Sequence, residues 1–233
     1  MTTFVLVPGA WLGGWCWQQV EQFLRSENHH AISVTLTGVG ERNHLLSPDV
    51  GLGTHVMDVV ATCEYVQDEP VVLVGHSYAG SVIEGAAATI PNRIARLVFV
   101  DAVTPVRGES FVSFFDRDAG QAVENQVVEI SGAGVLPPPS EIGGNWSVPA
   151  SQQRWFLNRV TPHPYRTWTD RLEQDAYSYS IPRMYISCQR NATDVLESSR
   201  SEAKRSPNWT YREISTGHMA MMSMPNELTQ LML

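Results

Sequence analysis

Ser77 lies in the surroundings that a serine nucleophile requires. Residues 75–79 read Gly-His-Ser-Tyr-Ala, directly after the apolar run 71–74 and just before an Ala-rich stretch. A buried strand, a sharp turn that carries serine and a following helix together form a nucleophile elbow. The turn requires small residues two positions before and after the serine, and Gly75 and Ala79 are small, although glycine is usual in the second place. The segment therefore predicts that Ser77 is a catalytic nucleophile.

A serine hydroxyl is a weak nucleophile near neutral pH and needs a base within hydrogen-bond reach. On a fold with a nucleophile elbow, the chain order is serine, acid, histidine. Of the seven histidines, only His218 follows the last predicted strand. His163 lies in a central insertion, and the other five precede or adjoin Ser77. We therefore expect His218 to be the general base.

The Gly-rich loop 8–15 follows the first predicted strand and reads Pro-Gly-Ala-Trp-Leu-Gly-Gly-Trp. Acyl transfer needs two N–H donors for the oxyanion, one of them from the residue after the nucleophile. We expect the backbone N–H groups of Tyr78 and Ala10 to be these donors. Gly9 and Trp11 flank Ala10 and are expected to contact substrate. An ordinary Gly-rich turn remains the alternative interpretation of this segment alone.

The elements that must position these residues alternate along the chain. Short apolar runs without polar alternation predict buried strands at residues 4–7, 31–34, 71–74, 97–100, 183–187 and 211–214. Apolar periodicity or Ala-rich composition predicts helices at about 15–24, 55–65 and 81–89, and from about 226. Strands of this kind separated by helices indicate an α/β fold with a mostly parallel, doubly wound sheet.

Residues 105–179 interrupt this rhythm and contain most of the tryptophans outside the first loop. A long insertion in a compact domain is usually functional. We expect a hydrolase core at 1–104 and 180–233 with a cap at 105–179, and we expect Trp146 and Trp155 to line the substrate site. A peripheral subdomain with its own small core is the alternative.

Segments 4–17, 36–42, 75–80 and 217–221 resemble the α/β-hydrolase branch that holds plant methylesterases, hydroxynitrile lyases and related bacterial esterases. The resemblance implies a Ser-His-Asp triad, no cofactor, no metal, and a helical cap inserted after the fourth central strand. It places the nucleophile at Ser77 and the base at His218. In the lyases a threonine and a lysine occupy the places of Gly9 and Met219. The chain therefore looks like an esterase that acts on a small, largely apolar ester through an acyl-enzyme.

Two residues depart from the family pattern. Pro8 replaces the usual histidine before the oxyanion loop, and Asn191 occupies the place of the triad aspartate. Asn191 could orient the imidazole as a neutral group, which is the explanation we favour. Asp194, three residues on, or Asp101, at the end of the strand 97–100, could instead supply the acid. The fourth explanation is a non-hydrolytic lyase, isomerase or cyclase on the same scaffold, or a binding protein.

Composition excludes several other classes of protein. The 233 residues carry 16 Lys and Arg against 24 Asp and Glu, a net charge of −8, which disfavours nucleic-acid and anionic-membrane partners. Lys204 is the only lysine, so a Schiff-base mechanism is not expected. The three cysteines have no metal-site spacing, and the N-terminus has no basic leader. We expect a cytoplasmic protein with a small-molecule substrate. The sequence does not define the oligomeric state, although lidded hydrolases often form dimers and a homodimer is one possible assembly.

Overall fold

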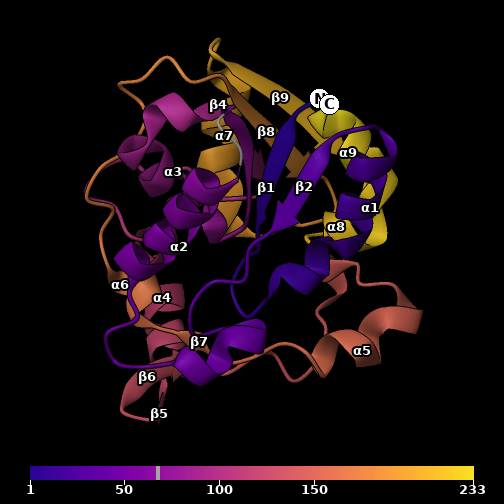
Figure 1. The fold of residues 1–233 in the computed structure, drawn as a ribbon. Coiled ribbons are helices and arrows are strands. Elements are labelled where there is room, and N and C mark those ends of the chain that lie inside the picture. The colour runs from indigo at the N-terminus through magenta and orange to yellow at the C-terminus, as the bar shows by residue number, and fades with distance from the viewer. Residues whose placement is uncertain (67–68) are drawn as a thin grey trace.

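A six-stranded parallel sheet forms the centre of the molecule, as a computed structural model of residues 1–66 and 69–233 shows (Figure 1). The strand order is β2-β1-β3-β4-β8-β9, so the strand that precedes Ser77 lies in the middle. The strands are β1 (Thr3–Val7), β2 (His30–Ser33), β3 (Val71–His76), β4 (Ile94–Val100), β8 (Arg183–Cys188) and β9 (Trp209–Ile214). All neighbouring strands in this sheet are parallel.

Helices cover both faces of the sheet and enclose a hydrophobic core on each. Along β1, Val5 and Val7 belong to one core, whereas Phe4 and Leu6 belong to the other. The first core packs under α2 (Leu52–Tyr65), α3 (Ala79–Thr89) and α7 (Glu197–Arg205). The second packs under α1 (Gln18–Ser26), α8 (Ala220–Ser223) and α9 (Pro225–Met232). Burial on both faces explains why the strands lack polar alternation.

The predicted strands and helices are confirmed, with ends that shift by a few residues. The first predicted helix divides into a 3₁₀ turn, Gly14–Trp17, and α1. The helix α7 was not predicted, because only Ser199 and Ala203 of its nine residues are buried and it therefore has no apolar period. The expected α/β-hydrolase architecture is present.

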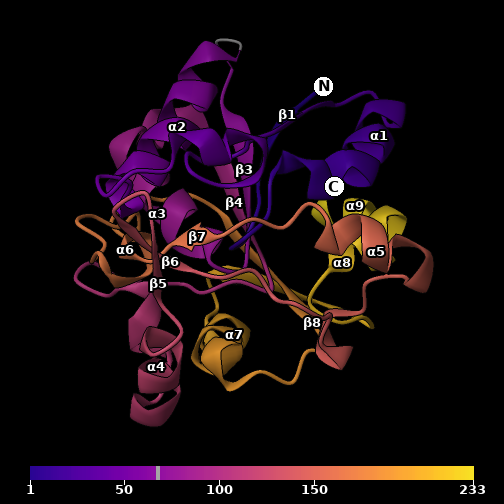
Figure 2. The ribbon, with the colours of Figure 1, turned by 90° about the horizontal axis from the view of Figure 1, so that it is seen from below.

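The insertion lies over the carboxyl ends of the central strands, below the sheet in Figure 1 and facing the viewer in Figure 2. It contains α4 (Arg117–Glu124), α5 (Gln153–Leu157) and α6 (Arg166–Thr169), with 3₁₀ turns at Phe111–Phe114, Gly144–Trp146 and Ala150–Gln152. It also holds a small antiparallel sheet that the expectation of a helical cap did not include. That sheet consists of β5 (Val128–Ile130), β6 (Ala133–Leu136) and β7 (His163–Pro164). We call residues 105–179 the cap.

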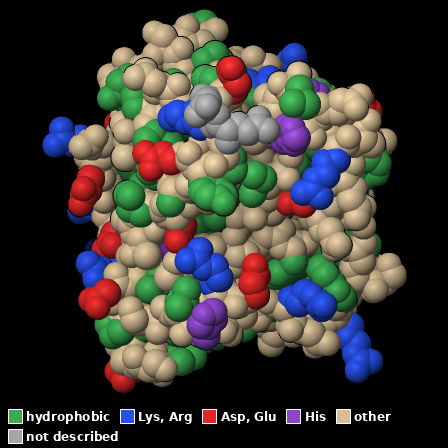
Figure 3. All heavy atoms as spheres, viewed as in Figure 1, with side chains coloured by type: hydrophobic (Ala, Val, Ile, Leu, Met, Phe, Trp, Pro, Cys, Tyr) green, Lys and Arg blue, Asp and Glu red, His purple; other side chains and the backbone are tan. Residues whose placement is uncertain are grey.

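Charged and apolar side chains are interspersed on the face of the molecule in Figure 3, with no large area of one kind. Among the described residues, no helix combines the length and the apolar character needed to cross a bilayer. Within the same residues, no three His, Cys, Asp or Glu side chains are grouped so that they could hold a metal ion.

Candidate active site

Ser77 occupies a tight turn between β3 and α3. Its φ of 56° lies in the left-handed region, which non-glycine residues adopt only when the surroundings impose it. The Ser77 N–H donates to Val100 O at 3.2 Å, and the Val103 N–H donates to Ser77 O at 3.2 Å, so the end of β4 and the loop after it hold the turn. A Cβ at Gly75 would lie 2.9 Å from Ala79 O, which explains the need for a small residue there.

The loop after β1 passes directly against the turn that carries Ser77. A Cβ on Gly9 would lie 2.9 Å from Ser77 Cβ and 2.8 Å from His76 Nδ1, so only glycine allows this approach. Ala10 and Tyr78, the expected oxyanion donors, are both buried. Within the described residues, neither of their backbone N–H groups has a hydrogen-bond partner in the protein. Two buried N–H groups without partners beside a serine can stabilise an oxyanion.

His218 lies in the loop after β9, and a carboxylate orients it. Its Nδ1 is 2.8 Å from Oδ2 of Asp101, the residue that directly follows β4. A carboxylate accepts a hydrogen bond from the Nδ1–H group and so leaves Nε2 as the basic atom. Ser77 and His218 line one cavity. The structure therefore brings together a serine, a histidine and an aspartate.

Asn191 is buried beside this pair. Its Nδ2 lies 2.6 Å from Asp101 Oδ2 and 3.0 Å from His218 Nδ1, and its Oδ1 accepts from Asn145 Nδ2 at 3.0 Å. Because Nδ1 already donates to Asp101, the Asn191 amide has no acceptor there and donates to the carboxylate instead. If the Asn191 amide were rotated by half a turn, Oδ1 would face the carboxylate and two acceptors would repel each other. The hydrogen bonds therefore define the orientation of the Asn191 amide. Asn191 therefore contacts the acid as well as the imidazole edge.

The surroundings of Asp101 keep its carboxylate ionised. Complete burial alone would raise its pKa, but the hydrogen bond and charge of His218 and the charge of Arg200 outweigh burial and lower the pKa to about 2. Arg200 Nη2 donates to Asp101 Oδ1 at 2.8 Å from α7, the helix that the sequence did not reveal. Asp194, the other acid that the sequence offered, is exposed at the start of a 3₁₀ turn before α7.

His76, the residue before Ser77, supports the backbone of the loop that carries His218. Its Nε2–H donates to His218 O at 2.9 Å, and the two imidazole rings lie 4.4 Å apart between centroids. Burial and the neighbouring His218 hold the pKa of His76 well below its usual value. A neutral His76 therefore positions His218 without competing with it for a proton.

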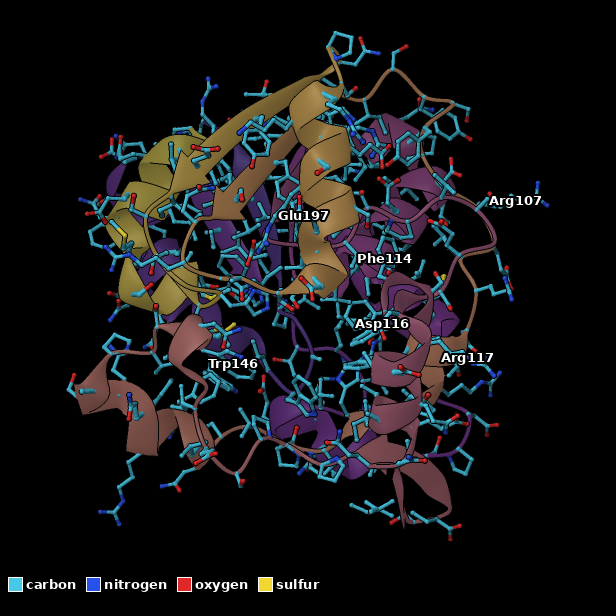
Figure 4. All side chains as sticks on the ribbon, turned by 180° about the vertical axis from the view of Figure 1, so that it is seen from behind. Arg107, Phe114, Asp116, Arg117, Trp146 and Glu197 are labelled. Carbon is cyan, nitrogen blue, oxygen red and sulfur yellow. The ribbon has the colours of Figure 1, made fainter. Side chains whose placement is uncertain are left out.

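An apolar cavity of about 280 Å³ opens over Ser77 and His218. Trp11 and Trp146 line it, as the sequence predicted, and Figure 4 shows Trp146 on the cap below the C-terminal helices. Trp155 instead packs against Trp15, 5.1 Å between ring centroids, beside a separate pocket. Further lining residues that the sequence did not single out as substrate contacts are Phe111, Phe115, Leu136, Asn145 and Trp168.

Comparison with known proteins gives the class to which this fold and site belong. Residues 4–231 match the Alpha/beta hydrolase family. The chain is 33% identical over 239 residues to the "Carbendazim hydrolyzing esterase" of Nocardioides sp. (strain SG-4G), covering 99% of this chain and 98% of that protein. It is 27% identical over 249 residues to Methylesterase 9 of Arabidopsis thaliana, covering 100% of this chain and 97% of that protein.

A solved structure, an extracellular α/β-hydrolase from a Paenibacillus species, has the same fold, with a TM-score of 0.87 at 23% identity. The alignment covers 100% of this chain and 98% of that one. The chain therefore belongs to the α/β-hydrolase family. Within the family it is a hydrolase of the carboxylesterase type.

Proposed function

We propose that this protein hydrolyses a small, largely apolar carboxylic ester through a Ser77–His218–Asp101 triad. The observation that carries this proposal is the 2.8 Å contact between His218 Nδ1 and Asp101 Oδ2. It supplies a carboxylate to the histidine that shares a cavity with Ser77, although Asn191 holds the usual acid position. The chain order of the triad becomes Ser77, Asp101, His218, which is still the order of this fold.

In the proposed reaction, Ser77 Oγ attacks the ester carbonyl carbon while His218 Nε2 takes the hydroxyl proton. The backbone N–H groups of Ala10 and Tyr78 donate to the carbonyl oxygen as it becomes an oxyanion. The alkoxide then leaves with the proton from His218 Nε2. Water attacks the acyl-serine and loses a proton to His218 Nε2, which passes it to Ser77 Oγ as the bond to the acyl group breaks and the carboxylic acid is released. Asp101 stabilises the imidazolium at both stages without taking the proton.

The cavity supports a flat, apolar group next to the ester. Its aromatic residues come from the oxyanion loop and from the cap, and the ring centroids of Trp11 and Trp168 lie 5.5 Å apart. Small aromatic methyl esters suit an apolar cavity of about 280 Å³ with an aromatic lining. They also match the activity in the name of Methylesterase 9. Carbendazim, which the Nocardioides relative is named for hydrolysing, is a second substrate to test.

The test combines turnover with active-site labelling. The purified protein is expected to release acid from methyl benzoate and p-nitrophenyl acetate, and a fluorophosphonate is expected to label Ser77. Ser77→Ala should lose both activities, with an unchanged circular dichroism spectrum. Absence of labelling at Ser77 in the wild-type protein would overturn the proposal.

The non-hydrolytic alternative was motivated by Asn191 and Pro8. The main argument for that alternative was that an amide replaces the triad acid. This argument is weaker because His218 contacts the Asp101 carboxylate as well as Asn191. We therefore propose hydrolysis alone.

A further inference from the structure

Trp11, the residue after the proposed oxyanion donor Ala10, has a backbone conformation that it would not adopt on its own. Its φ is 65°, in the left-handed region that a bulky side chain avoids. Such a residue persists only where its surroundings over-determine it. The conformation of Trp11 determines the path of the loop that presents the Ala10 N–H beside Ser77.

Cap residues hold every polar group of Trp11. The Trp11 N–H donates to His163 Nδ1 at 3.2 Å, and the Thr161 N–H donates to Trp11 O at 3.1 Å. The indole N–H donates to Leu136 O at 3.3 Å. Although the sequence assigned the oxyanion loop to the core and these residues to the cap, the geometry of the loop depends on both.

The hydrogen bonds around His163 define its tautomer. Thr167 Oγ1 donates its proton to Pro164 O at 2.7 Å, so it must accept at its contact with His163 Nε2, which is 2.9 Å away. The proton of the imidazole is therefore on Nε2, and Nδ1 is left as an acceptor for the Trp11 N–H. Burial and the neighbouring His55 hold the pKa of His163 well below its usual value, which keeps the ring neutral.

The same imidazole also packs against the other half of the oxyanion hole. The rings of His163 and Tyr78 lie 5.1 Å apart between centroids. His55 Nε2 lies 2.8 Å from Thr37 O, a carbonyl that can only accept, so the imidazole proton is on Nε2. His55 Nδ1 therefore accepts a hydrogen bond from the Tyr78 hydroxyl at 3.1 Å. His163 thus contacts both Trp11, which follows the proposed donor Ala10, and Tyr78, which is the other proposed donor.

We propose that His163 is a positioning residue for the oxyanion hole: by accepting the Trp11 N–H, it fixes the peptide between Ala10 and Trp11. This inference rests on the proposed function. Without the acceptor, that peptide can rotate so that Trp11 relaxes to a negative φ. The accompanying shift of the loop displaces the preceding peptide, between Gly9 and Ala10, which carries the Ala10 N–H. Since oxyanion contacts strengthen in the transition state, the loss appears in kcat and not in KM.

The experiment compares two replacements of His163. His163→Leu removes the acceptor, whereas His163→Asn keeps an amide oxygen near the position of Nδ1. We expect His163→Leu to lower kcat by about 10- to 100-fold, somewhat less than removal of a whole donor, with KM within about threefold. His163→Asn should recover most of the loss. The inhibition constant of a trifluoromethyl ketone, which mimics the tetrahedral intermediate, should rise in parallel with the loss of kcat.

Loss of stability is controlled separately. Cys63→Ala truncates a fully buried residue of the same core, on α2, and should reduce the unfolding temperature without changing kcat. If Cys63→Ala lowers kcat as much as His163→Leu at equal loss of stability, or if His163→Leu keeps wild-type kcat, the positioning role is wrong.

Two readouts separate this inference from the proposed function. A through-hydrogen-bond ¹⁵N–¹⁵N coupling between Trp11 N and His163 Nδ1 should be present in the wild-type protein, and its absence contradicts the contact itself. The rate at which a fluorophosphonate labels Ser77 should fall with His163→Leu, because phosphonylation uses the same N–H donors. If wild-type Ser77 is labelled but esters are not hydrolysed, the proposed function fails and the labelling rates still decide the role of His163.

Discussion

At the scale of single residues, Asp101 and Asn191 both lie at Nδ1 of His218 but form different hydrogen bonds there. Asp101 Oδ2 lies 2.8 Å from Nδ1, and Asn191 donates to the same oxygen. We expect Asp101→Asn to lower kcat by about 10³- to 10⁴-fold, because an amide neither stabilises the imidazolium nor selects the correct tautomer. Steady-state kinetics on p-nitrophenyl acetate measure this loss.

The matched comparisons are Asn191→Ala and Asp194→Asn. Asn191→Ala removes one donor to the carboxylate and should cost about 10-fold, close to the worth of one hydrogen bond to a charged group. Asp194→Asn, at an exposed position, should leave kcat unchanged. A larger loss for Asn191→Ala than for Asp101→Asn would show that Asn191 is the orienting residue.

The low pKa of Asp101 also predicts how stability depends on pH. In the native protein this pKa is lowered from its ordinary value of 3.8 to about 2. A lowered acid pKa contributes stability that is fully present above the unfolded value and is lost as pH falls through the folded value. The wild-type protein should therefore lose about 2 kcal/mol relative to Asp101→Asn between pH 5 and pH 2. Urea unfolding of both proteins at each pH measures this difference, and a constant difference would contradict it.

The sequence could predict the serine, the histidine and the oxyanion loop because each lies at a fixed place relative to a strand. It could not choose among the acids. Asp101 and Asn191 follow β4 and β8, which are neighbouring strands, so both side chains reach the same edge of the sheet. Both contact His218 Nδ1, and the cation that pairs with Asp101, Arg200, comes from α7, a helix with no periodic signal in the sequence. His163 lies in the insertion, before the last strand, where this fold places no general base, so its sequence position indicates no role at the site.

At the scale of elements, a segment of the cap holds the loop of His218. The N–H groups of His218 and Met219 donate to Asn145 O and Trp146 O at 2.8 and 2.9 Å, and the Gly217 N–H donates to Ser147 Oγ at 3.0 Å. This part of the cap is thus joined to the loop that carries His218. The aromatic content of the cap predicted a cover over the site. The backbone hydrogen bonds between the cap and the His218 loop could not be predicted, because they do not depend on side-chain composition.

Gly217→Ala tests the contact between these two elements. A Cβ there would lie 2.2 Å from Asn145 O and 2.4 Å from Ser147 Oγ, so the cap segment or the histidine loop must shift. We expect kcat to fall by about 10- to 100-fold, because a displacement near 1 Å of a catalytic group has costs of this order. Gly144→Ala, in the same cap segment but facing open space, is the control and should retain wild-type kcat. Equal activity of the two variants would contradict the coupling.

At the scale of the whole molecule, one buried ion pair joins the helix that follows Ser77 to the far half of the sheet. Glu84 of α3 pairs with Arg183 at the start of β8, and both side chains are buried. The guanidinium lies 4.1 Å from the ring centroid of Tyr177, and the Ala176 N–H donates to Glu84 Oε2 at 3.2 Å. Burial nevertheless outweighs Arg183 and raises the pKa of Glu84 above its usual value. The pair is therefore costly to desolvate and still more costly to break.

This balance predicts opposite results for single and double replacements of the pair. Glu84→Gln leaves a buried guanidinium without a counter-charge and should lower the free energy of unfolding by about 3 to 5 kcal/mol. The double variant Glu84→Leu with Arg183→Met removes both charges and should recover most of that loss, because apolar residues need no desolvation. Urea unfolding of the wild-type protein, Glu84→Leu, Arg183→Met and the double variant gives the coupling energy. Additive losses in the double variant would mean that each side chain stabilises the fold independently, and that the two halves of the sheet are not joined through this pair.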